Sequence, residues 1–122
     1  MICEAIQDTI AAIVTNTFPI IGDEETEAPF CLHTETEQEP SLLKEGEESY
    51  NFLVEIFIAD KLPDSVETNA ALIRTAIEGL KGTTVRSVFF NEVNYEGNDP
   101  GFDAESREYA NYLRFTVNTK NR

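Results

Sequence analysis

The stretch from Tyr50 to Leu80 constrains the fold more than any other part of this sequence, because it combines two different periods. In its first part, apolar side chains recur at every second position, which is the period of a β-strand with one face turned toward a core. These residues are Tyr50, Phe52, Val54, Ile56 and Ile58. Leu53 and Phe57 make the opposite face partly apolar as well, so we expect a central strand.

A helix is expected directly after this strand. Apolar residues now recur at steps of four and three, the spacing of one helical face, at Val66, Ala70, Ile73, Ile77 and Leu80. Asp64 and Glu67, at capping-box spacing just after Pro63, mark its expected start, and Gly82 marks its expected end. Since a helix with one apolar face must cover a sheet, the stretch predicts a two-layer domain.

The remaining patterns predict one further helix and three further strands. The helix is expected at Ile2–Thr15, and the strands at Pro29–Thr36, Thr83–Tyr95 and Tyr109–Thr119. Strict alternation along Thr83–Tyr95 places Phe90 and Val93 on opposite faces of that strand. Turn-forming residues fill Glu96–Asp103, which we interpret as a hairpin loop between the last two strands.

These elements predict an α+β fold in a single domain spanning residues 1–122. The connections are short, which favours antiparallel neighbours. We therefore expect a two-layer architecture with a four-stranded, mainly antiparallel sheet and two helices on one of its faces, in the order α-β-β-α-β-β.

The charge of the chain restricts its partners. The formal net charge is −14, and the acidic residues concentrate between Gly22 and Tyr50. This argues against binding to nucleic-acid phosphates or to an anionic membrane, which both require an excess of Lys and Arg. Two interpretations stay open: a solvated surface that maintains solubility, or an acidic surface that repels or imitates DNA.

Within this acidic region, Glu37–Ser49 is expected to form a long mobile loop, because it contains Pro40, Gly46 and several Glu residues. Leu42 and Leu43 form an apolar patch inside it. Two roles are open for this patch, which either packs back on the domain or contacts another subunit.

The sequence shows no pattern of a catalytic, metal or cofactor site. Cys31 and His33, on one face of an expected strand, offer two metal ligands, whereas a zinc site needs three or four. We expect no further ligand to complete such a site, so we interpret both as ordinary strand residues. We expect no cofactor and do not expect an enzyme.

Four aromatic residues are expected to gather around the last hairpin, and they are Tyr95, Phe102, Tyr109 and Tyr112. Packing in the core and the turn would explain them. An interface would explain them equally well, because aromatic anchors beside polar loops are common at subunit contacts.

The layout of the chain resembles the small tail-completion, or tail-terminator-like, proteins of long-tailed bacteriophages and prophages, which are encoded near the head–tail joining region. The resemblance spans most of the chain and concerns the arrangement of elements more than a strict motif. It is carried by the helix at Ile6–Val14, Pro29–Phe30, the strand Tyr50–Phe57, the helix from Ala70 to Gly82, the acidic turn Tyr95–Asp99 and the strand Tyr109–Phe115.

The resemblance implies a structural virion protein. Such proteins form a homo-oligomeric ring, usually of six copies, at the head-proximal end of the tail. The ring ends growth of the tail tube and joins it to the capsid neck. The implied partners are further copies of the chain, the tail-tube protein and a neck or connector protein, without specific nucleic-acid or membrane binding. The implied location is the tail or neck of a virion assembled in the bacterial cytoplasm.

The resemblance also suggests roles for surface residues. An acidic lumen would let DNA slide through the ring without adhering. The candidates for this DNA-repelling acidic loop are Glu35, Glu37, Glu39, Glu45, Glu47 and Glu48. The candidates for subunit and tube contacts are Leu42, Leu43, Tyr95, Phe102, Tyr109 and Tyr112.

Two alternatives remain beside the terminator role. One is another neck, head-closure or minor tail component of the same assembly. The other belongs to a different class, an acidic DNA-mimic inhibitor of a DNA-binding enzyme. The crowding of the acids into one region argues against the mimic, whose charges would be spread at phosphate-like spacing.

Overall fold

The computed structural model describes residues 2–15, 17–19, 30–38, 41–42, 48–105 and 107–121. Its elements are α1 (Ile2–Ala11), β1 (Thr17–Pro19), β2 (Phe30–Glu37), β3 (Ser41–Leu42), β4 (Glu48–Asp60), α2 (Pro63–Glu78), β5 (Thr84–Val85), β6 (Val88–Asp103) and β7 (Glu108–Asn121).

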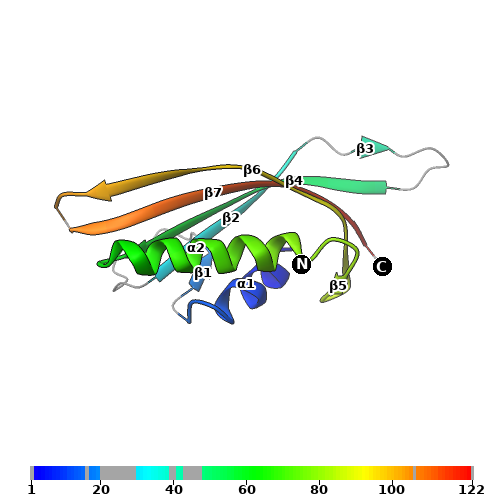
Figure 1. Ribbon diagram of the computed structural model, residues 1–122. Coiled ribbons are helices and arrows are strands. Elements are labelled where there is room, and N and C mark those ends of the chain that lie inside the picture. The colour runs from blue at the N-terminus through cyan, green and yellow to red at the C-terminus, as the bar shows by residue number, and fades with distance from the viewer. Residues whose placement is uncertain are drawn as a thin grey trace.

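One sheet carries the fold, with the strand order β1-β2-β4-β7-β6-β5 and with β3 paired to β4 outside that path. The four long strands β2, β4, β7 and β6 pair antiparallel, and only the short β1 runs parallel to its neighbour. Both helices lie on the same side of the sheet (Figure 1). The predicted α+β order and the central position of β4 are confirmed, while the short strands β1, β3 and β5 were not predicted.

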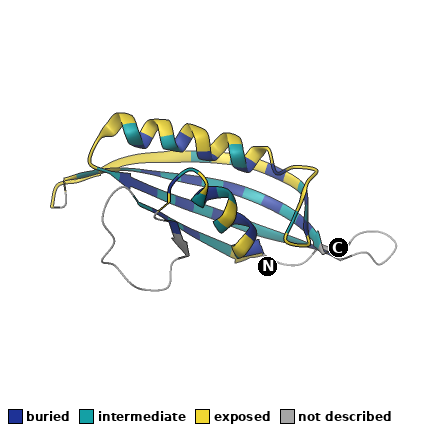
Figure 2. Ribbon diagram, turned by 90° about the horizontal axis from the view of Figure 1, so that it is seen from below, coloured by how far each residue is buried: buried dark blue, intermediate teal, exposed yellow. Residues whose placement is uncertain are grey.

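The core lies between the helices and the face of the sheet that they cover. In the second half of β4, alternate residues are fully buried there, at Val54, Ile56 and Ile58. The predicted stripe of α2 is buried at all five positions, which are Val66, Ala70, Ile73, Ile77 and Leu80. In Figure 2, buried segments recur along α2 between exposed ones. Phe90 and Phe115 are the largest fully buried side chains.

The ends of the helices differ from the prediction. Pro63 occupies the first turn of α2 and Leu62 is the N-cap, without a side-chain capping bond, so the expected capping box at Asp64 and Glu67 is wrong. Proline is common at this position because its fixed φ suits the first turn of a helix. An N–H group at this position would have no partner within the helix, so its absence costs nothing. The helix ends at Glu78 rather than near Gly82, and α1 ends at Ala11 rather than Thr15.

The expected strand Thr83–Tyr95 is interrupted by a tight turn. Arg86 and Ser87 have φ values of 48° and 66°, and they connect β5 to β6. Two consecutive positive φ values are typical of the two-residue hairpin turn whose twist matches that of its strands. The Nε of Arg86 lies 2.5 Å from Oδ2 of Asp8 in α1, so an ion pair connects this turn to the first helix.

The segment Glu96–Asp103 is part of β6 and not the predicted loop. It pairs with β7 up to Asp103↔Glu108, so that the hairpin connection is confined to residues 104–107. The long alternating strand β7 provides a partner for these residues and overrides their turn propensity. Pro100 is tolerated because β6 is an edge strand in this part, where the missing N–H interrupts no ladder in the described sheet.

Two β-bulges also change which β6 residues face the helices. The pairing register shifts between Phe90 and Glu92 and again between Tyr95 and Gly97. Asn91 is therefore an extra residue, and Phe90 and Val93 are both buried, which contradicts their expected placement on opposite faces.

The acidic segment 37–49 is not a continuous loop. β2 extends to Glu37, and Ser41 and Leu42 pair with Ser49 and Glu48 at the start of β4. Leu43, Glu39, Glu45 and Glu47 lie outside the described residues, as do the side chains of Leu42 and Glu48. Among the residues that the structure describes, no helix has the length and apolar character to cross a membrane.

Gly97 should be the glycine of β6 that tolerates substitution least. Its φ is +127°, which residues with a Cβ rarely adopt, although an added Cβ would meet only Arg114 Nη2 at 3.7 Å. We expect Gly97→Ala to lower the free energy of unfolding by about 1–3 kcal/mol through backbone strain, measured by urea denaturation. Gly101→Ala is the matched control, because a Cβ there meets nothing within 4 Å and φ is not positive. Equal stability of the two variants would contradict this.

Candidate functional site

The hairpin formed by β6 and β7 carries two exposed aromatic residues near its closed end. Phe102 and Tyr109 are paired across the strands, with ring centroids 4.8 Å apart, and they are 55% and 37% exposed. We call them the tip pair. The closed end of the hairpin reaches past the N-terminal end of α2 (Figure 1). The tip pair is thus available for contact with another molecule.

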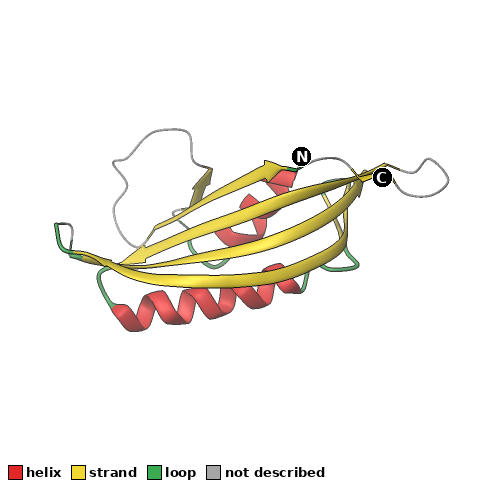
Figure 3. Cartoon of the chain, turned by 90° about the horizontal axis from the view of Figure 1, so that it is seen from above, coloured by secondary structure: helices red, strands yellow, loops and turns green. Residues whose placement is uncertain are grey.

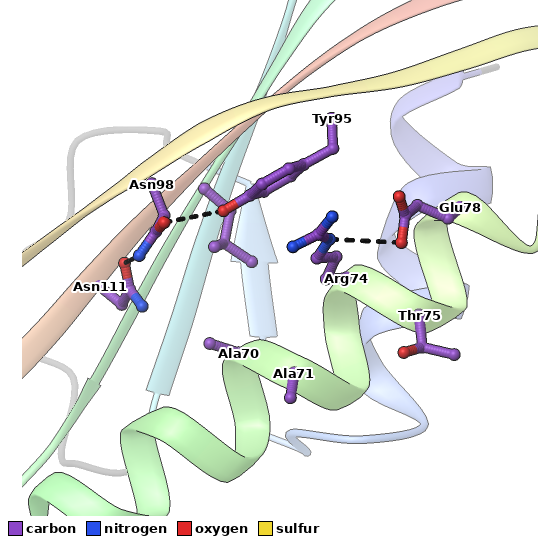
Figure 4. Close-up of a pocket in the computed structure, with 9 residues that line it drawn as sticks. Ala70, Ala71, Arg74, Thr75, Glu78, Tyr95, Asn98 and Asn111 are labelled. Carbon is purple, nitrogen blue, oxygen red and sulfur yellow. Dashed lines mark hydrogen bonds and ion pairs between the residues drawn. The ribbon is translucent and has the colours of Figure 1, made fainter.

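A groove runs between α2 and the hairpin. One hollow of about 460 Å³ is lined by Ala70, Ala71, Arg74, Thr75, Glu78, Tyr95, Asn98, Asn111 and Leu113 (Figure 4). A second hollow of about 300 Å³ continues toward the tip pair, shares Asn98 and Asn111, and includes Tyr109. We refer to both hollows together as the α2–hairpin groove.

Polar contacts organise the walls of this groove. The Tyr95 hydroxyl donates to Asn98 Oδ1 at 2.8 Å, and Asn98 Nδ2 donates to Asn111 Oδ1 at 3.1 Å. The guanidinium of Arg74 stacks over the Tyr95 ring, with its central carbon 3.7 Å from the ring centroid. A cation over an aromatic face is attracted by the ring quadrupole, which holds both side chains in place. Tyr95 therefore belongs to the groove wall and also packs against Phe115.

The opposite face of the sheet, which we call the outer face, carries a row of aromatic rings. Phe30, Phe57 and Tyr112 lie on β2, β4 and β7, with successive ring centroids 6.0 and 6.3 Å apart. The Tyr112 hydroxyl donates to Glu55 Oε2 at 3.1 Å, and burial followed by this carboxylate raises the pKa of Tyr112. None of the described helices lies across this face (Figure 3).

The four predicted aromatic contacts therefore do not form one cluster. Phe102 and Tyr109 lie together at the tip, Tyr95 lies further along the same face, and Tyr112 lies on the outer face. The reason is the two-residue period of β7, which turns odd-numbered residues toward the helices and even-numbered residues away. The predicted contacts Leu42 and Leu43 stay predictions, because their side chains lie outside the described residues.

Glu35 is not part of a solvent-facing acidic loop, contrary to the prediction. It lies within β2, its side chain is 4% exposed, and its Oε2 is 2.6 Å from Nδ1 of His33. Glu37, at the end of the same strand, is exposed as expected. Of the other acidic candidates, Glu48 begins β4, and the described structure does not test the remaining ones.

His33 is the centre of a cluster that sequence reasoning missed. It is fully buried, and its Nε2 lies 2.7 Å from Oε1 of Gln7 in α1. Gln7 Nε2 donates to the backbone carbonyl of Thr17 at 2.6 Å, so Gln7 presents its oxygen, an acceptor, to His33. Both ring nitrogens of His33 then face oxygen atoms, Nε2 that of Gln7 and Nδ1 that of Glu35.

The cysteine beside His33 is Cys3 of α1 and not Cys31. The potential ligand atoms of Cys3, His33 and Glu35 all lie within 4.8 Å of one another. Cys31 is fully buried in the apolar core, where burial raises the pKa of its thiol to about 12. Cys3 and Gln7 are one helical turn apart, which was the available signal, but only tertiary packing brings them to His33.

This cluster does not have the arrangement of an activated cysteine nucleophile. Burial, and then the charge and hydrogen bond of Glu35, raise the pKa of the Cys3 thiol, whereas a nucleophilic cysteine requires a lowered one. Both nitrogens of His33 are hydrogen-bonded to oxygen atoms instead of sulfur.

Comparison with known proteins shows a shared fold. No protein-family model matches the chain, and no curated protein sequence matches it. A chain of a solved structure described as "Virion of native gene transfer agent (GTA) particle" is similar to it, with a TM-score of 0.68 and 11% sequence identity. The similarity covers 97% of this chain and 93% of that one. The two chains therefore share one fold over nearly their full lengths.

The two cysteines should differ in their reactivity toward iodoacetamide. Because the thiolate is the reactive form and the pKa of both thiols is raised, we expect Cys3 to react slowly near neutral pH and faster as the pH rises. Cys31 should not react in the folded protein. Glu35→Gln should accelerate alkylation of Cys3 by removing the negative charge, and Glu37→Gln should not. Peptide mass spectrometry in the presence of EDTA would measure the alkylation rate of each cysteine. Equal rates for Cys3 in the two variants would contradict the effect of the Glu35 charge on this thiol.

Proposed function

We propose that this chain is a structural component of a phage-like virion, and specifically a ring-forming protein at the head-proximal end of the tail. In that role it ends the tail tube and joins it to the neck of the capsid. The observation that carries the proposal is the shared fold with a chain of a gene transfer agent virion, which covers both chains almost completely. The order of elements, which resembles tail-completion proteins, supports the more specific role.

Two apolar surfaces of the domain, the exposed tip pair and the partly exposed aromatic row, suit a ring of identical subunits. A closed ring requires two different surfaces on each copy, so that one copy binds the next in a head-to-tail manner. The tip pair lies on the helix-bearing side of the sheet, and the aromatic row lies on the outer face. We propose that the tip pair of one subunit contacts the outer face of its neighbour.

The charge distribution is compatible with DNA passing such a ring. Several of the few cations in the described structure are already paired, namely Arg74 with Glu78, Lys81 with Glu92, Arg86 with Asp8 and Arg114 with Asp99. With a formal charge of −14, the surface has little capacity to hold phosphates. DNA would be repelled from the lumen instead of adhering to it. We propose no catalytic role.

The first test is the number of copies per particle. Purified particles would be analysed by quantitative mass spectrometry, with the tail-tube protein as the internal reference. We expect a constant, small number of copies, equal to one ring. Hundreds of copies would indicate a tube or capsid protein. Absence from particles, with abundance in the lysate, would overturn the virion proposal and favour an acidic DNA mimic.

Assembly should depend on the tip pair. We expect the double variant Phe102→Ser/Tyr109→Ser to remain monomeric where the unmodified chain forms rings, because the contact loses its two aromatic anchors. Leu72→Ser is the matched control, since Leu72 is a 50% exposed apolar residue on α2 outside both surfaces. Light scattering after size-exclusion chromatography gives the mass, and circular dichroism confirms folding. Rings formed by the folded double variant would exclude this contact.

A further inference from the structure

We propose that Cys3, His33 and Glu35 form a metal site suited to zinc. The three side chains offer a sulfur, a nitrogen and an oxygen ligand, and these atoms lie within 4.8 Å of one another. Zinc binds this combination of ligand types in tetrahedral sites, with distances of about 2.0–2.3 Å to each ligand atom. Three protein ligands leave a fourth position, which a water molecule can occupy.

The surroundings of His33 are those that orient a metal-binding imidazole. A histidine that binds a metal through one nitrogen almost always donates the N–H of the other nitrogen to a fixed acceptor. Here Nε2 faces Gln7 Oε1 at 2.7 Å, and the contact of Gln7 with the Thr17 carbonyl fixes that amide. Nδ1 is therefore the nitrogen turned toward Glu35 and available for the metal.

The charges of the cluster also balance around a divalent cation. Without metal, Glu35 Oε2 lies 2.6 Å from Nδ1 of His33, and the Cys3 thiol is hydrogen-bonded to Glu35. Zinc would replace the thiol proton of Cys3 and would lie between Nδ1 of His33 and the Glu35 carboxylate. The resulting thiolate and carboxylate would then neutralise its two positive charges. Because the contact between His33 and Glu35 forms without metal, we expect the metal-free protein to fold, so that it can be studied.

The choice of metal follows from the ligand types. Thiolate and imidazole are preferred by zinc and similar transition metals, whereas calcium and magnesium prefer oxygen ligands. A bound ion would link α1, which carries Cys3, to β2, which carries His33 and Glu35. Its structural effect would be to hold the first helix against the sheet.

Cobalt provides the most direct test, because it occupies zinc sites and its bond to a thiolate absorbs in the near ultraviolet. We would add Co²⁺ to the metal-free Cys31→Ala variant, in which Cys3 is the sole cysteine of the sequence. We expect the thiolate–cobalt absorption to saturate at one equivalent and to disappear when Zn²⁺ is added. Zn²⁺ should also raise Tm and protect Cys3 from alkylation.

Two further variants make the assignment specific. Cys3→Ser should abolish the absorption, and Gln7→Ala should weaken zinc binding about 10–100-fold through loss of the imidazole's orienting acceptor. Glu37→Ala is the control, since Glu37 lies on β2 but is exposed. Absence of the absorption from the folded Cys31→Ala variant would overturn the proposal. So would alkylation of Cys3 that proceeds equally fast with and without Zn²⁺. Neither result would bear on the ring proposal.

Discussion

The antiparallel pairing of β4 with β7 determines which side chains of the sheet face the helices and which face the outer side. Val54 is paired with Phe115 and Ile56 with Leu113, and all four side chains are buried beneath the helices. Because side chains alternate along a strand, this single register fixes the core face and the outer face together. If either strand slipped by one residue, its buried side chains would turn to the outer face and its outer side chains would turn toward the helices.

The parts of the fold that the sequence predicted are those in which one local period repeats without interruption. The alternation in β4 and the apolar stripe of α2 each depend on one buried face, and both were predicted correctly. The errors in β6 have one cause. Gly97, Asn98 and Pro100 have turn propensity, but pairing with β7 extends the strand through them, and the bulge at Asn91 shifts the alternation. Contacts between distant segments decided these positions.

The interaction surfaces were predictable only as residue types. Aromatic residues near the last hairpin were recognised, but the face on which each one lies depends on strand register, which divides Tyr109 from Tyr112. The cluster around His33 was missed for a related reason. Gln7 and Glu35 are polar residues of ordinary appearance in the sequence, and the packing of α1 on β2 makes them partners of one buried ring.

The two bulges of β6 have a consequence for aligning this sequence with others of the same fold. Asn91 and Glu96 are surplus residues, and after each of them the pairing of β6 with β7 resumes. A chain of the same fold could lack either residue and still pair these two strands along their length. In an alignment without gaps, two such sequences would be shifted by one residue after each insertion or deletion, although their backbones would superpose. Two chains can thus share one fold while few of their aligned residues are identical, as 11% identity beside a TM-score of 0.68 illustrates.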